Sequence, residues 1–172
     1  MTATPAPHLR AVRPTWTHRH PAWFLALFVL LSEAAGIAVA YATTRGHSWY
    51  ARLAHPSFAP PVWVLTPAWA VMAALTGVAA WRVWRHHRTW QRDVALRWWT
   101  VQLLLAAAWA PILFVARRPG WALVDVGALV VVAVVTALRF LPFDRRASAM
   151  NLVYVAWVAF VVALTAAVVS LN

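Results

Sequence analysis

Five long blocks of apolar residues place the strongest limit on what this chain can fold into. Each block approaches the roughly 20 residues that an α-helix needs to cross the hydrocarbon core of a bilayer. A backbone inside hydrocarbon must satisfy its own hydrogen bonds, so the blocks predict helices. A transmembrane β-barrel would need alternating segments of about ten residues, and no such pattern occurs. The predicted helices cover residues 22–42, 61–83, 98–116, 120–141 and 148–171.

The composition supports an integral membrane protein. Of the 172 residues, 63% are hydrophobic and 11% are charged, whereas about a quarter of the residues in a soluble domain are charged. We therefore expect an all-α fold, a bundle of five transmembrane helices over residues 21–172. Residues 1–20 are polar, basic and rich in proline, and they predict a disordered N-terminal tail.

The charge distribution points to lipid and membrane topology. All fifteen basic residues are arginines, and the net charge is +11. The arginines lie between apolar blocks, so we expect anionic lipid as a partner and no nucleic acid. Eleven arginines fall on one side of the predicted membrane and four on the other. This asymmetry predicts that the N-terminus lies in the cytoplasm and the C-terminus outside. We expect the protein in the cytoplasmic (inner) membrane.

The connection before the second block has an unusual sequence. Residues 55–69 read HPSFAPPVWVLTPAW, with four prolines and three aromatic residues. Pro60 cannot donate a backbone hydrogen bond, whereas Pro61 suits the first position of a helix. The stretch predicts an extended loop that turns sharply into a helix. It fits either a re-entry point at the membrane interface or the lid of a ligand pocket.

Thirteen tryptophans are far more than usual for this length. Most lie at block ends, where they predict an aromatic belt at the membrane interface. Trp63, Trp69, Trp109 and Trp157 lie within blocks and are candidates for lining an internal site. Core packing is the alternative, and a buried indole N–H needs a hydrogen-bond partner in either case.

Two acidic residues fall inside apolar blocks. Glu33 lies near the middle of the first block, where it must face the bundle, be protonated or pair with a donor. Its surroundings, Ser-Glu-Ala-Ala-Gly, resemble the membrane glutamate of small multidrug-resistance transporters, so proton binding for coupled transport is an alternative function. Ser32, Gly36 and Ala40 beside it would let another helix approach closely. Asp125 is expected to be a structural residue with Arg117 or Arg118 as its partner.

Enzymatic chemistry finds little support in the sequence. Cysteine is absent, and the adjacent His86 and His87 cannot share one helix face. No nucleophile–histidine–acid arrangement, phosphate loop or acidic pair at metal spacing occurs. We therefore expect no catalytic residues, no metal and no bound cofactor. Pro111, next to Trp109, is expected to interrupt the hydrogen bonding of the third helix and kink it.

Several motifs in order match one known pattern. They are Trp49-Tyr50, Pro56-Ser-Phe-Ala-Pro-Pro61 followed by Trp69, Gln102-Leu103 with Trp109-Ala-Pro-Ile-Leu-Phe114, Tyr154-Val-Ala-Trp157-Val-Ala-Phe160, and Leu171-Asn172. With five helices and many tryptophans, the chain resembles the TspO/MBR family of tryptophan-rich sensory proteins and translocator proteins. The resemblance covers residues 22–172.

The resemblance implies a membrane protein that binds a flat hydrophobic ligand. Members are five-helix bundles, often homodimers, that bind porphyrins, benzodiazepine-type compounds or, in some cases, cholesterol beneath the first loop. We accordingly expect a homodimer and a porphyrin, haem-type or sterol-like ligand. Roles in transport and in porphyrin degradation are implied only by the family. A purely structural membrane subunit is a further alternative. The implied ligand-binding residues are Phe58, Trp63, Trp69, Trp109, Tyr154 and Trp157.

The chain departs from the family pattern at several polar positions. Ala73 replaces a tyrosine, Ala106 replaces an asparagine and Thr165 replaces a second asparagine. Phe58 stands where the family usually has tryptophan. These changes predict a pocket that is larger and more apolar, with fewer groups to orient a ligand.

Overall fold

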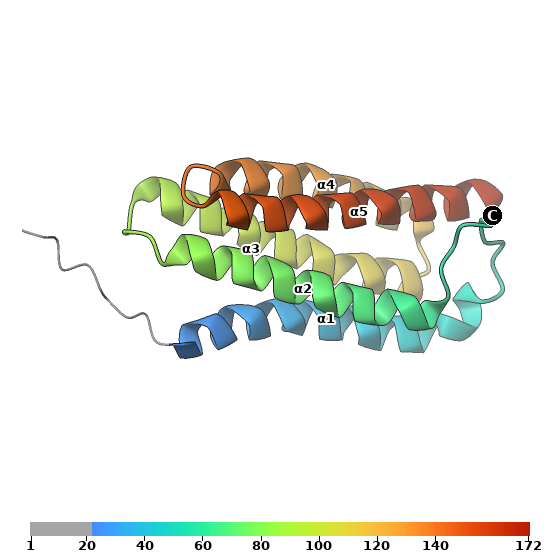
Figure 1. The fold of residues 1–172 in the computed structure, drawn as a ribbon. Coiled ribbons are helices and arrows are strands. Elements are labelled where there is room, and N and C mark those ends of the chain that lie inside the picture. Colours follow the sequence, from blue (N-terminus) through green and yellow to red (C-terminus); the bar gives the residue numbers. More distant parts are fainter. Residues whose placement is uncertain (1–21) are drawn as a thin grey trace, which may run out of the picture.

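A computed structural model describes residues 22–172. They form a long bundle of helices, drawn in Figure 1. The expected disordered tail, residues 1–20, lies outside the described residues. Five long helices, all apolar enough to cross a membrane, account for most of the described chain. Their bounds are α1 Ala22–Tyr50, α2 Val62–Trp84, α3 Trp90–Ala110, α4 Pro119–Phe140 and α5 Arg145–Leu171, with a short π-helix, η1, at Pro111–Val115.

The helices pack side by side in a closed ring rather than in chain order. Each one contacts two main neighbours, in the order α1, α2, α5, α4, α3 and back to α1. Small residues such as Ala79, Ala110 and Ala133 are fully buried between the helices. Within a bilayer, close packing of this kind is a main force that holds helices together. The prediction of an all-α five-helix membrane bundle is confirmed.

Two helices extend well beyond their predicted ends. α1 continues through residues 43–50, which are too polar to be recognised as part of an apolar block. The Thr43 and Thr44 hydroxyls donate to the carbonyls of Val39 and Tyr41 at 2.8 Å, which satisfies their polarity within the helix. α3 begins at Trp90 because the Thr89 side chain caps it, accepting a hydrogen bond from the Arg92 N–H at 3.2 Å. The predicted loops, 43–60 and 84–97, are therefore shorter than expected.

α1 and α2 cross at very short range. A Cβ added to Gly77 would lie 2.8 Å from the Phe28 carbonyl oxygen and 2.8 Å from Ser32 Oγ. One turn away, a Cβ at Gly36 would lie 3.9 Å from Ala73 Cβ. The small residues on α1 thus allow the close helix approach that their spacing predicts.

Pro111 interrupts α3 as expected. From this residue the backbone continues as the π-helix η1, in which Ala116 N–H donates to the Pro111 carbonyl at 2.9 Å. Because proline has no N–H to offer, the α-helical pattern cannot continue unchanged. The wider turn brings Leu113 and Phe114 into the core, where both are buried.

A buried amide pair ties three helices together. Gln102 of α3 and Asn151 of α5 have no exposed surface. Gln102 Nε2 donates to Asn151 Oδ1 at 3.2 Å, and Asn151 Nδ2 donates to the Ala133 carbonyl of α4 at 2.8 Å. Hydrogen bonds between transmembrane helices contribute roughly 0.6 kcal/mol on average. The pair therefore fixes the register of α3, α4 and α5 more than it adds stability.

Asp144 joins the start of α5 to α2. Its Oδ1 accepts hydrogen bonds from the N–H groups of Arg146 at 2.8 Å and Ala147 at 3.2 Å. Its Oδ2 lies 2.7 Å from Arg82 Nη2 of α2. Burial by itself would raise the pKa of Asp144, but the hydrogen bonds from Ala147, Arg82 and Arg146 outweigh it and hold that pKa below its ordinary value.

We expect Asp144→Ala to lower the free energy of unfolding by about 1 kcal/mol, the usual cost of losing a helix cap. Asp144→Asn keeps an acceptor for the cap but loses the ion pair. It should therefore lower the free energy of unfolding by less than Asp144→Ala does. Because the folded pKa is lowered, the charge stabilises the fold above pH ~4 and this contribution disappears as the pH falls through the folded pKa. Thermal unfolding in detergent at several pH values measures this. A gap between wild type and Asp144→Asn that stayed constant down to low pH would contradict it.

Most tryptophans lie where the sequence predicts, either in the interface belt or in the core, but some do not. Trp23, Trp90 and Trp121 lie near helix ends and are largely exposed, as an interface belt requires. Trp99, expected in the belt, is instead buried, with its ring 5.4 Å from the ring of Phe28. The reason is the earlier start of α3, which places Trp99 well inside that helix.

Candidate functional site

A continuous series of aromatic rings runs through the end of the bundle beneath the loop of residues 51–61. Neighbouring rings in the series have centroids 4.6–6.4 Å apart. Trp69 occupies the middle, 5.6 Å from Trp109 and 6.0 Å from Trp157. We call this series the aromatic arc, and its members in order are His55, Tyr50, Phe114, Trp109, Trp69, Trp157, Phe160 and Phe58.

The arc begins and ends on the same loop. His55 and Phe58 both belong to residues 51–61, whereas the rings between them come from α1, η1, α3, α2 and α5. Trp69 and Trp109 are 5% and 4% exposed, and Phe58 at the end of the arc is 52% exposed. The loop therefore covers a buried aromatic interior, which supports the interpretation of the 55–69 stretch as a lid.

The loop is also fastened to the chain end. Asn172 Oδ1 accepts a hydrogen bond from the Ala54 N–H at 3.0 Å, and Asn172 Nδ2 donates to the Ala54 carbonyl at 3.1 Å. The same Nδ2 donates to the Val168 carbonyl of α5 at 2.9 Å. Figure 1 shows the C-terminus beside the loop that joins α1 and α2. We call these bonds the Asn172 clasp.

Two small cavities flank Trp69. One, bounded by Gly36, Ala73, Ala106 and Tyr154 among others, offers about 10 Å³ to the centre of a water molecule. The other lies between Trp69, Tyr50, Trp109 and Phe114 and offers about 20 Å³. Each has room for little more than one water molecule. The larger pocket expected from Ala73 and Ala106 is therefore not present in this structure, because α1 approaches α2 closely there.

Two indole N–H groups of the arc are buried without a hydrogen-bond partner among the described residues. They belong to Trp109 and Trp157. A buried donor that stays unpaired costs roughly 1–3 kcal/mol. A ligand oxygen reaching either indole would recover part of that cost. The arc thus combines flat apolar faces with donors that could orient a polar edge.

Most of the predicted ligand-binding residues come together. Phe58, Trp69, Trp109 and Trp157 all belong to the arc, and Tyr154 is buried beside Trp69 at the smaller cavity. Trp63 is the exception, because its side chain is 77% exposed. It precedes Trp69 by roughly 240° around the helix, so the two indoles lie on different faces of α2. Trp63 thus shares the exposure of the belt tryptophans.

The two acidic residues of the apolar blocks lie outside the arc. Glu33 is half-buried on α1, where its Oε2 is 3.5 Å from the Cβ position of Gly36. Its role as a proton-binding group stays a prediction. The expected pairing of Asp125 is wrong: among the described residues neither Arg117 nor Arg118 bonds to it, and its Oδ2 is buried without a partner. The side chain points into the bundle, whereas both arginines are exposed.

Four residues of the arc were not predicted as site residues: Tyr50, His55, Phe114 and Phe160. Tyr50, Phe114 and Phe160 lie inside the motifs that carry the family resemblance, so the motifs could have identified them as site residues. The contribution of His55 depends on how the loop folds back over α1, which no local pattern reveals. Within residues 22–172, no group of three His, Asp or Glu side chains is placed to hold a metal ion.

Comparison with known proteins gives one family and several relatives. The family description "TspO/MBR family" matches residues 28–171. The chain is 35% identical over 144 residues to the Translocator protein of Homo sapiens, covering 81% of this chain and 85% of the relative. It is 31% identical over 153 residues to the Tryptophan-rich protein TspO of Chlorobaculum tepidum, covering 86% and 95%. The Tryptophan-rich sensory protein of Cereibacter sphaeroides is 30% identical over 133 residues, covering 77% and 82%.

The family match spans most of the helical bundle and includes every segment that contributes to the aromatic arc. The family match and the relatives confirm the resemblance that the sequence motifs indicate. The chain belongs to the TspO/MBR family.

Proposed function

We propose that this membrane protein binds a flat hydrophobic molecule, a porphyrin or a sterol-like lipid, within the aromatic arc beneath the loop of residues 51–61. The observation that carries the proposal is the arc itself, a run of edge-to-face and tilted ring contacts that begins and ends on the covering loop. Stacked aromatic pairs contribute about 0.5–1.5 kcal/mol beyond the area they bury. Relatives named translocator or sensory protein fit a binding role better than an enzymatic one.

A ligand of this size could bind only if the bundle opened beneath the loop of residues 51–61. Pockets for small molecules measure roughly 300–1,000 Å³, and the cavities beside Trp69 are far smaller. The loop is the segment best placed to move, because most of its residues are exposed. Opening it would break the Asn172 clasp and the ring contacts at His55 and Phe58. Ligand rings would then replace contacts that the arc now makes with itself. The indole N–H groups of Trp109 and Trp157 would donate to oxygens at the ligand edge.

We expect the double variant Phe58→Ala/Trp157→Ala to weaken protoporphyrin binding about tenfold, because two stacking faces are lost. The measurement is a titration of the purified protein that follows tryptophan quenching and the shift of the porphyrin absorption band. Trp63→Ala is the matched control, since it also removes one tryptophan but lies outside the arc. Equal affinity in the double variant and the wild type would exclude the arc as the site.

A sterol-like ligand is distinguished by competition. A sterol that shares the arc should displace protoporphyrin from the wild-type protein. A sterol that binds elsewhere should leave the quenching curve unchanged. If Phe58→Ala/Trp157→Ala bound both protoporphyrin and the sterol as tightly as the wild type does, the aromatic arc would be core packing only.

A further inference from the structure

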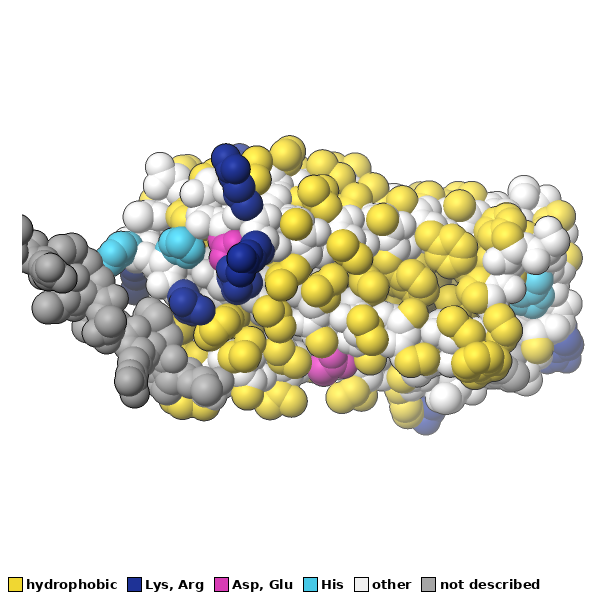
Figure 2. Space-filling view, in the orientation of Figure 1, with side chains coloured by type: hydrophobic (Ala, Val, Ile, Leu, Met, Phe, Trp, Pro, Cys, Tyr) yellow, Lys and Arg dark blue, Asp and Glu magenta, His cyan; other side chains and the backbone are white. Residues whose placement is uncertain are grey.

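One end of the bundle carries most of its positive charge. Two connections meet there, the α2–α3 connection at residues 85–89 and the α4–α5 turn at residues 141–144. The rings of His86 and Phe143, one from each connection, lie 6.0 Å apart, and Arg82 near the end of α2 pairs with Asp144 of the turn. Figure 2 shows basic side chains gathered at this end, at the edge of a surface that is otherwise largely hydrophobic. We call this surface the basic end.

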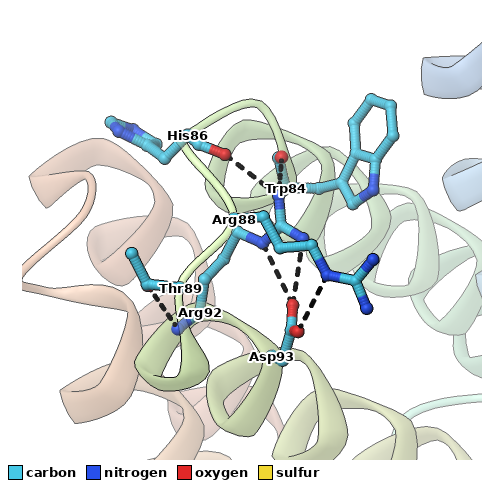
Figure 3. A network of polar contacts seen from close by, with 6 residues as sticks. All are labelled: Trp84, His86, Arg88, Thr89, Arg92 and Asp93. Carbon is cyan, nitrogen blue, oxygen red and sulfur yellow. Dashed lines mark hydrogen bonds and ion pairs between the residues drawn. The ribbon is translucent and has the colours of Figure 1, made fainter.

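Both acidic residues of the basic end are already engaged. Asp93 pairs with Arg92 at 2.9 Å and Arg88 at 3.3 Å, and the Arg92 guanidinium also donates to the carbonyls of Trp84 and His86 (Figure 3). Asp144 caps α5 and pairs with Arg82. Neither carboxylate is free to neutralise a further arginine.

Three arginines that flank the α4–α5 turn have no internal role. Arg139 ends α4, and Arg145 and Arg146 begin α5. All three are exposed, and within residues 22–172 none of their guanidinium groups has an ion pair or hydrogen bond. Arg145 and Arg146 also lie at a helix N-terminus, where the helix dipole disfavours positive charge. Folding of the bundle therefore does not account for them.

The surroundings of these arginines are apolar. Leu138 and Leu141, on the last turn of α4 and just after it, are 61% and 49% exposed. The guanidinium group is suited to bidentate contact with phosphate oxygens. The N–H groups of Arg146 and Ala147 are occupied by Asp144, so an anion would meet the side chains rather than the helix terminus. A ligand that satisfies this surface has a phosphate next to a hydrocarbon chain.

We propose that Arg139, Arg145 and Arg146 form a binding site for the headgroup of an anionic phospholipid whose acyl chains lie along Leu138 and Leu141. This site is at the opposite end of the bundle from the aromatic arc and is independent of the ligand bound there. A free phosphate would contact the arginines but would gain nothing from the leucines. An anionic lipid gains from both.

The test compares lipid binding by purified full-length protein in a neutral detergent, measured by native mass spectrometry. The ligands are phosphatidylglycerol, phosphatidylcholine and inorganic phosphate. An arginine near an anionic lipid surface contributes about fivefold in affinity. Replacing all three arginines by glutamine should weaken phosphatidylglycerol binding on the order of 100-fold, and Arg139→Gln alone about fivefold.

The matched control is the triple variant Arg45→Gln/Arg117→Gln/Arg118→Gln, which removes the same charge from the other end of the bundle. It should bind phosphatidylglycerol as the wild type does. Equal weakening in both triple variants would overturn the proposal in favour of a general charge effect. It would equally be overturned if phosphatidylcholine bound as tightly as phosphatidylglycerol, or if millimolar phosphate displaced the lipid. Thermal unfolding in detergent alone verifies that each variant is folded, and Arg139→Gln decides the case if a triple variant is not.

Discussion

Trp69→Ala should lower the free energy of unfolding by about 3–5 kcal/mol, the largest loss we expect from any single truncation in this chain. Trp69 is 5% exposed, contacts both Trp109 and Trp157, and separates the two cavities. Its removal would merge these cavities into one and leave the neighbouring rings without a packing partner. Thermal or denaturant unfolding in detergent measures the loss.

A cavity of this origin has a second, more specific signature. An apolar void lined by aromatic and aliphatic groups can take up a small aromatic molecule. Benzene or indole should therefore raise the melting temperature of Trp69→Ala and leave the wild type unchanged. Trp63→Ala, which truncates the same residue type at an exposed position of the same helix, should alter neither quantity. A Trp69→Ala protein as stable as Trp63→Ala would show that the arc does not hold the bundle together.

Gly46→Ala is expected to destabilise the protein by about 1–3 kcal/mol, although alanine is the better helix former. A Cβ at this position would lie 2.5 Å from both Cβ and the carbonyl oxygen of Phe114. Because part of the obstruction is backbone, it cannot be relieved by a side-chain rotation. α1 and η1 would have to separate, and the contact between Tyr50 and Phe114 would be strained with them.

Gly127→Ala provides a control of opposite sign. Gly127 lies on α4, and apart from its chain neighbours and the adjacent backbone of α4, no atom of the described residues falls within 4 Å of its added Cβ. The same substitution there should raise stability by up to about 1 kcal/mol through helix propensity alone. Opposite shifts of melting temperature for the two variants would support the packing argument. Two stabilising shifts would show that η1 can move away from α1 at little cost.

The sequence was sufficient to predict the architecture because a bilayer permits few solutions. Long apolar blocks must become helices, and five of them were recognised with their approximate centres. The helix ends were less predictable, since hydropathy identifies the part of a helix that lies in lipid and not the helix itself. Residues 43–50 are helical because of local hydroxyl bonds and contact with η1, and Trp90 begins α3 because of a cap at Thr89. Neither the hydroxyl bonds nor the cap contributes to hydropathy, so neither extends an apolar block.

The candidate site was predictable in its parts but not in its connections. Trp69, Trp109 and Trp157 stood out as interior tryptophans, and the motif order indicated Phe58 and Tyr154. What no pattern could show was the partner of each residue across the bundle. Asn172 bonds to a backbone group 118 positions away, and Gln102 meets Asn151 only because α3, α4 and α5 share one packed region. Such pairings depend on the ring order of the helices.

The Asn172 clasp has a consequence for how the covering loop can vary. In the loop, the Asn172 amide bonds only to the backbone N–H and carbonyl of Ala54, and no side chain of the loop takes part in the clasp. Any amino acid with a backbone N–H can occupy that position and keep both bonds, whereas proline would lose one of them. The loop can therefore diverge in sequence, or be randomised in a library selected for new ligands, while its attachment to α5 is retained. The clasp thus depends on backbone atoms of the loop, whereas the ring contacts at His55 and Phe58 depend on its side chains.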